Sequence, residues 1–221
     1  MGINRDFSNA MVILENKLLA ALETNAGKDL PYHNNKHMEG VWGIAQHIWA
    51  FDRDTKDPVV NEQSLTILMC AALLHDYDHS GGDTTDHYNV LRAREYVSEL
   101  LAQEHMAVSP EIREAVDKAI ACTVYPFTVE PVTQVEKVLR DADILYATLS
   151  RDPRIIMEDL RAEIGVAAKR EISYQEMLDG QAKFTEGVVL FTTSGKGVWD
   201  IHQLKYLEQL TNYVKEREQS E

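Results

Sequence analysis

Histidine and aspartate residues gather in two short segments of the chain. Four of the eight histidines lie in residues 32–37 (Tyr-His-Asn-Asn-Lys-His) and 75–79 (His-Asp-Tyr-Asp-His). In each segment the two histidines are four residues apart, a spacing that places both on one face of a helix. Asp76 follows His75 at the end of an apolar run, so the pair is expected to be buried, where polar groups need strong partners. A metal ion is a natural partner.

The residue types in these segments indicate the metal chemistry. Imidazole and carboxylate ligands together suit a first-row divalent metal. A carboxylate has two oxygens, so Asp76 could bridge two ions, and such a site would make hydroxide near neutral pH and clamp a phosphate. A further protein ligand must come from elsewhere. Residues 140–144 (Arg-Asp-Ala-Asp-Ile) offer two aspartates, Asp141 and Asp143, in an otherwise apolar helical segment.

A structural role is the alternative for each of these residues. An isolated buried His-Asp pair is usually a structural hydrogen bond, but two clusters with the same spacing favour a metal site. His47 and His202 have no acidic companion in their helical segments, so they are interpreted as structural or surface residues. His87 follows the Gly81-Gly82 turn close to the second cluster, and its role stays open.

The elements that must position these residues are predicted to be helices. Apolar residues recur with a period of about 3.6, and no convincing strand is found. Residues 192–197 contain Gly-Lys-Gly but lack the full phosphate-loop pattern and its preceding strand, so they are predicted to be a plain loop. The predicted helices cover about 7–24, 36–51, 61–75, 86–104, 110–123, 132–149 and 152–169, a segment that begins after Ser173, and 198–218.

Length and composition limit the class of protein. The 221 residues, with short loops and neither a repeat nor a long linker, predict one compact all-α domain over 1–221, with the motifs at about 30–200. Acidic residues number 36 against 22 basic ones, a net charge of −14, which disfavours nucleic acid as a partner. An anionic substrate would need buried positive charge, which two divalent ions could provide.

Cysteine usage and hydropathy indicate the compartment. Cys70 and Cys122 lie in apolar helical segments and are predicted to be buried free thiols. The first residues show no signal-peptide core, and no apolar run approaches the length of a membrane span. A soluble cytoplasmic protein without a membrane partner is the expectation.

The motifs resemble those of the HD-domain superfamily of metal-dependent phosphohydrolases. The superfamily signature is a His, then His-Asp, then a later Asp, which His37, His75, Asp76 and Asp143 would supply. The sequence looks most like the catalytic domain of class I cyclic-nucleotide phosphodiesterases. That group is similar in its Tyr-His-Asn-x-x-His, His-Asp-x-Asp-His, Ala-Asp-Leu and Gln-x-x-Phe motifs, matched at 32–37, 75–79, 142–144 and 181–184.

This resemblance implies a role for each matched residue. His37, His75, Asp76 and Asp143 would hold the tighter of two divalent ions (Mn, Fe, Zn, Co or Mg), and Asp76 would bridge to the second. His33 would be the general acid that protonates the leaving oxygen, and an acidic neighbour would keep it protonated. His79 would orient metal-bound water or a ligand. The residues implied to position or bind the substrate are Tyr32, Gln181 and Phe184.

Other functions remain open at this level. The implied substrate is a small phosphate ester, with a cyclic nucleotide favoured over a nucleoside monophosphate or polyphosphate. Polyphosphates usually need several Lys or Arg side chains, and only Lys36, Arg92, Arg94 and Arg140 lie near the motifs. A non-catalytic, metal-stabilised module that binds a nucleotide or a partner protein is the alternative of another class. The oligomeric state is not indicated.

Overall fold

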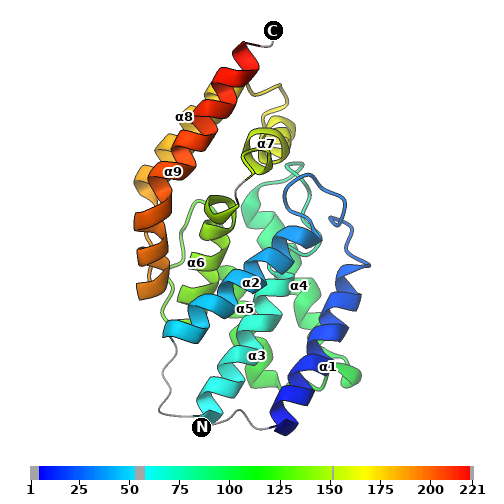
Figure 1. Ribbon diagram of the computed structural model, residues 1–221. Coiled ribbons are helices and arrows are strands. Elements are labelled where there is room, and N and C mark those ends of the chain that lie inside the picture. The colour runs from blue at the N-terminus through cyan, green and yellow to red at the C-terminus, as the bar shows by residue number, and fades with distance from the viewer. Residues whose placement is uncertain (1–4, 53–57, 151, 220–221) are drawn as a thin grey trace.

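The computed structural model describes residues 5–52, 58–150 and 152–219, and every regular element in those ranges is a helix (Figure 1). The predicted all-α fold is therefore confirmed for the described part of the chain. In chain order the elements are α1 (Arg5–Leu22), α2 (Asn35–Asp52), α3 (Pro58–Leu74), α4 (Asp86–Ala102), the 3₁₀ turn η1 (Glu104–Met106), α5 (Pro110–Ala121), α6 (Gln134–Leu149), the π-helical η2 (Ile155–Leu160), α7 (Arg161–Ala168), α8 (Tyr174–Gly187) and α9 (Thr193–Glu218).

Local capping signals determine where several helices begin. Ser109 caps α5 by accepting the Ile112 N–H, and Pro110 occupies the first helical position. At the start of α8, the Ser173 hydroxyl accepts the Glu176 N–H while the Glu176 carboxylate accepts the Ser173 N–H. These bonds satisfy backbone groups that the first turn of a helix leaves unpaired. Both helix starts predicted from serine are confirmed.

Helix α3 lies inside the larger hydrophobic core. It packs against α1, α2, α5 and α6, and every residue from Leu68 to Leu74 is buried. A helix that is apolar on all sides is stable only when neighbours cover each side. Because α3 ends within the core, the residues that follow it are also buried: His75 is 0% exposed and Asp76 is 6% exposed.

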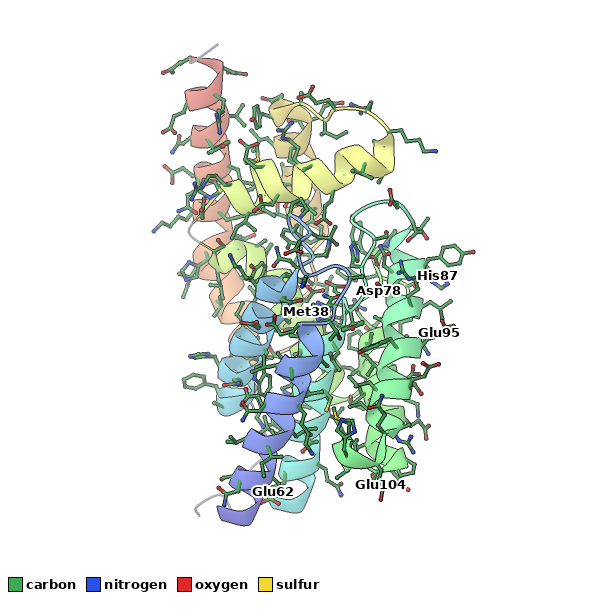
Figure 2. All side chains as sticks on the ribbon, turned by 90° about the vertical axis from the view of Figure 1, so that its right-hand side faces the viewer. Met38, Glu62, Asp78, His87, Glu95 and Glu104 are labelled. Carbon is green, nitrogen blue, oxygen red and sulfur yellow. The ribbon has the colours of Figure 1, made fainter. Side chains whose placement is uncertain are left out.

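A smaller core joins the elements after α6. Helix η2 leads directly into α7, and α8 and α9 lie side by side (Figure 1). Buried side chains from η2, α8 and α9, among them Ile156, Met177 and Leu210, form this second cluster. Figure 2 shows the yellow-green η2 and α7 lying across one end of the bundle that contains α2 and α3. The smaller core therefore fixes η2 and α7 in place across that end of the bundle.

The prediction of a plain loop at 192–197 was wrong, because α9 begins at Thr193. The Thr192 hydroxyl accepts the Gly195 N–H at 2.9 Å. Asp141 of α6 accepts the N–H groups of Phe191 and Thr192 and the Thr192 hydroxyl, at 2.7–3.1 Å. A carboxylate at a helix N-terminus stabilises the first turn, so this contact outweighs the weak helix propensity of two glycines.

Two further expectations can be compared with the fold. Cys70 and Cys122 are buried and unpaired, as predicted. Burial raises the pKa of the Cys70 thiol to about 12, so it remains protonated and unreactive near neutral pH. Among the described helices, none combines the length and apolar character needed to cross a bilayer.

Candidate metal centre

Three helices bring four sequence-predicted residues to one point. His37 lies in the first turn of α2, His75 and Asp76 follow the last residue of α3, and Asp143 lies within α6. The helices α2, α3 and α6 all pack against one another. The side chains of His37 and His75 are 1% and 0% exposed, whereas that of Asp143 is 22% exposed. The cluster is therefore buried on one side and accessible on the Asp143 side.

The donor atoms of this cluster face one another at short distances. Nε2 of His37 lies 3.1 Å from Oδ2 of Asp76 and 3.3 Å from Oδ1 of Asp143. Nε2 of His75 lies 3.2 Å from Oδ2 of Asp76, 3.6 Å from Oδ1 of Asp143 and 3.2 Å from Nε2 of His37. Ligands about 2.0–2.2 Å from a common ion are separated by about 2.8–3.6 Å at octahedral or tetrahedral angles. The donor atoms of His37, His75 and Asp143 all lie within 4.8 Å of one another and fit a divalent metal, and the Asp76 carboxylate lies beside both histidines.

The surroundings of the two histidines orient their Nε2 atoms inward. His75 Nδ1 contacts the Ala72 carbonyl at 2.9 Å, which assigns the ring proton to Nδ1 and leaves Nε2 as the ligand atom. Nδ1 of His37 is buried with no hydrogen-bond partner among the described residues. The Tyr146 ring packs edge-on against His37, with centroids 4.6 Å apart. Two Nε2 atoms in contact cannot both carry protons, and a shared cation removes that conflict.

The two aspartates are held as carboxylates. Burial alone would raise the pKa of Asp76, but the neighbouring imidazoles of His75 and His37 lower it well below its usual range. Burial would also raise the pKa of Asp143, but the imidazoles of His37 and His75 beside it lower that pKa. Ionised carboxylates are the form that binds a cation, so the electrostatics agree with the geometry.

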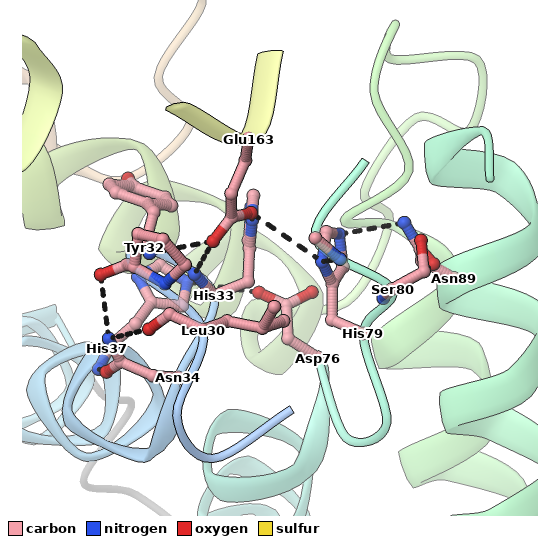
Figure 3. Close-up of polar contacts among 12 residues, drawn as sticks. Leu30, Tyr32, His33, Asn34, His37, Asp76, His79, Ser80, Asn89 and Glu163 are labelled. Carbon is pink, nitrogen blue, oxygen red and sulfur yellow. Dashed lines mark hydrogen bonds and ion pairs between the residues drawn. The ribbon is translucent and has the colours of Figure 1, made fainter. Parts of the chain in front are cut away.

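A second polar group is built around His33 and Glu163. Glu163 of α7 is 4% exposed and accepts the backbone N–H groups of Tyr32 at 2.7 Å and His33 at 3.0 Å. Its other oxygen lies 2.6 Å from His33 Nδ1. Figure 3 shows Glu163 beside Tyr32 and His33, with dashed lines marking its bonds to their backbone N–H groups. Burial lowers the pKa of His33, but the hydrogen bond to Glu163 and the negative charges of Asp76, Glu163 and Asp143 together outweigh burial and raise the pKa. Glu163 is the acidic neighbour that His33 was expected to need.

His79 lies against His33. The two imidazole rings stack with centroids 3.8 Å apart. Nδ1 of His79 faces the Gly81 N–H, and Nε2 faces the amide nitrogen of Asn89, whose oxygen accepts the Ser80 N–H. Burial lowers the pKa of His79 to about 4, so the ring is neutral. The donor atoms of His33, His79 and Glu163 also lie within 4.8 Å of one another, a spacing that could hold a second ion.

A family model for the HD domain matches residues 35–148, more than half of the chain. The chain belongs to the HD-domain family. Members of this family are generally metal-dependent phosphohydrolases. The matched span contains His37, His75, Asp76 and Asp143, and the superfamily predicted from these motifs is confirmed. No curated protein matches the sequence.

The metal centre of this HD domain opens into a cavity of about 820 Å³. The cavity is lined by seven of the residues singled out in the sequence: Tyr32, His33, Asp76, His79, Asp143, Gln181 and Phe184. The wall of the cavity also contains apolar residues, among them Ile144, Ile156 and Met177. The Gln181 side-chain oxygen accepts the Tyr206 hydroxyl at 2.6 Å. Acidic, polar and apolar side chains therefore line one cavity.

Other candidates from the sequence lie outside the metal centre. Asp141 caps α9, as described above, and so does not join Asp143. His87 is exposed on α4 and is absent from the described cavity wall. Asn34 caps α2 by accepting the N–H groups of Lys36 and His37.

The sequence did not single out Glu163 as a partner of the HD motif. It lies in α7, far along the chain, among several other acidic residues. One signal was the Gly81-Gly82 pair. Gly82 has a positive φ of 101°, and a Cβ there would lie 2.3 Å from the Glu163 carbonyl oxygen. Glycine lets the turn after the HD motif approach the α7 backbone, which positions Glu163.

Proposed function

We propose that this HD domain hydrolyses a nucleotide phosphodiester, with a cyclic nucleotide as the best candidate. The proposal rests on the position of His33 in the same cavity as the metal-ligand residues Asp76 and Asp143. Glu163 binds His33 there, with its carboxylate oxygen 2.6 Å from Nδ1. A closed structural metal site has no need of a separate histidine with a raised pKa. A proton donor next to an open metal site is what ester cleavage requires.

Each residue of the site takes a defined part in this reaction. Two divalent ions (Mn, Fe, Zn, Co or Mg), when bound, would supply an acidified water and positive charge for the phosphate. His37, His75, Asp76 and Asp143 would hold the first ion. Asp76 also lines the cavity, so its carboxylate can be shared with the second ion. His33, protonated and oriented by Glu163, gives its Nε2 proton to the departing oxygen.

The charges along the cavity favour a substrate with a single phosphate group. Arg170 is the one Lys or Arg side chain in the described cavity wall, and it is paired with Glu176 at 2.9 Å. Arg92 and Arg94 bind Asp78 and Asp117 instead. Without free cations along the wall, a second or third phosphate would meet no compensating charge. This weighs against nucleoside polyphosphates.

The apolar part of the cavity suits a nucleobase. Because the Gln181 oxygen already accepts the Tyr206 hydroxyl, the Gln181 amide nitrogen remains to donate to an acceptor on the base. Phe184 lines the same region and offers an aromatic ring for stacking. Tyr32 lies at the edge of the metal centre, with its ring centroid 5.1 Å from that of His37. These contacts support nucleotide binding.

The proposal is tested by measuring bound metal and the turnover of cyclic nucleotides, monophosphates and triphosphates. Replacing His33→Ala should reduce hydrolysis of a cyclic nucleotide by about 100- to 10,000-fold. It should reduce cleavage of a 4-nitrophenyl phosphodiester far less, because that leaving group needs no proton. His87→Ala, an exposed histidine on α4, is the matched control. Absence of bound metal, or equal losses on both esters, would contradict the proposal.

A further inference from the structure

Tyr125, in the turn between α5 and α6, presents an aromatic ring at the cavity that the hydrolytic scheme does not use. It lines the cavity and is 52% exposed. Aromatic rings are large apolar surfaces, and covering one with a bound molecule is favourable. A half-exposed ring in a cavity wall is therefore available to a ligand.

The turn that carries Tyr125 is anchored independently of any ligand. The Tyr125 N–H donates to the Asp86 carboxylate at 2.5 Å. The ring packs edge-to-face on Phe127, with centroids 5.4 Å apart. The guanidinium of buried Arg140 lies 4.0 Å from the Phe127 ring centre and donates to the Val129 carbonyl at 2.7 Å. Because the ring is already in place, binding to it requires little further ordering.

The ring also contacts a residue from a distant part of the chain. Tyr125 and Phe184 of α8 meet with centroids 5.9 Å apart and planes at 61°. Both line the cavity, and their contact leaves a corner of two aromatic surfaces. A planar group would lie against that corner and touch both rings.

The corner lines the same cavity as two of the candidate metal ligands, Asp76 and Asp143. Burial and then the charge of Asp76 raise the pKa of Asp86 to about 6, although the Tyr125 N–H acts in the opposite direction. Asp86, Thr123 and Tyr125 all line the cavity with Asp76 and Asp143. An organic group attached to a phosphate at the metal centre would therefore reach the Tyr125 ring.

We propose that Tyr125 is a specificity-determining residue which, together with Phe184, binds a planar organic group carried by the phosphate ester. The proposal rests on the proposed function, because it takes the phosphate to lie at the metal centre. It extends that function by selecting phosphate esters whose alcohol carries an aromatic or heteroaromatic group over phosphate esters that carry none.

The test compares two ligands that differ only in the planar group. Adenosine 5′-monophosphate and ribose 5-phosphate are titrated into the Mn²⁺-loaded full chain by calorimetry. Tyr125→Leu, which keeps apolar bulk but removes the ring, should weaken binding of the nucleotide by about 5- to 10-fold and change ribose 5-phosphate by less than about twofold. Tyr125→Phe should retain wild-type affinity for both. Tyr88→Ala, a 58% exposed tyrosine on α4, is the control.

The outcomes separate this proposal from the hydrolytic one. Equal losses on both ligands, no loss in Tyr125→Leu, or a wild-type protein that binds both ligands equally well would overturn the role of Tyr125. The measurement needs no turnover. Binding that depends on Tyr125 in a protein without phosphodiesterase activity would support this proposal and overturn the proposed reaction. Phosphodiesterase activity in a protein whose nucleotide binding does not depend on Tyr125 would support the proposed reaction and overturn the role of Tyr125.

Discussion

Replacing Glu163→Gln tests how the proton of His33 is held. The change keeps the shape of the side chain and removes the charge that faces His33 Nδ1 at 2.6 Å. A hydrogen bond to a charged group is worth about 1.5–3 kcal/mol. If this interaction is present only while His33 is protonated, its loss corresponds to a reduction of about 10- to 150-fold in kcat/KM. The loss should be largest for esters with poor leaving groups.

The pKa of His33 predicts how the activity of the Glu163→Gln variant changes with pH. The hydrogen bond to Glu163 raises the pKa of His33 against the opposing effect of burial. His33 acts in its protonated form, so activity is lost as pH rises through that pKa. In Glu163→Gln the pKa of His33 falls, and the descending limb of the pH–rate profile should move to lower pH. Below both pKa values the two proteins should differ least.

The assay is steady-state hydrolysis of an unactivated phosphodiester by metal-loaded protein across a range of pH. Glu171→Gln, an exposed glutamate that is absent from the described cavity wall, is the control and should behave as the wild type. Metal content and thermal unfolding are measured in parallel. An unchanged descending limb with normal metal content would refute the role given to Glu163, as would an equal loss on a 4-nitrophenyl ester.

Two matched pairs of variants test the remaining structural reasoning. Asp143→Asn should remove bound metal and reduce activity more than about 100-fold, whereas Asp141→Asn should retain metal and lose about 1–3 kcal/mol of unfolding free energy, because it binds backbone at the start of α9. Metal analysis and urea denaturation distinguish the two variants. Metal loss in Asp141→Asn with retained metal in Asp143→Asn would show that Asp141 is the ligand. Gly40→Ala should destabilise by about 1–3 kcal/mol, since a Cβ there would lie 2.3 Å from the Tyr146 ring. On the same helix, Gly43→Ala meets nothing within 4 Å and should stabilise by about 0.5–1 kcal/mol; equal effects would contradict the packing argument.

The local sequence determined the features whose causes are local. Ser109 with Pro110, and Ser173 with Glu176, mark helix starts because a cap is made within one turn. The apolar run before His75 indicated that the His-Asp pair is buried. Such patterns can be read from residue order, since the interacting groups are only a few positions apart.

Tertiary structure decided the features whose partners are distant in the chain. Asp141 and Asp143 have similar sequence surroundings, but they lie at different angles around α6, so one faces α9 and the other faces His37. Residues 192–197 read locally as a loop, yet carboxylates from Asp141 and Asp52 bind the start of α9. Glu163 becomes the partner of His33 only because α7 folds across the start of α2. A carboxylate acts on whatever its oxygens reach within about 3 Å, and only the packing of helices sets that distance.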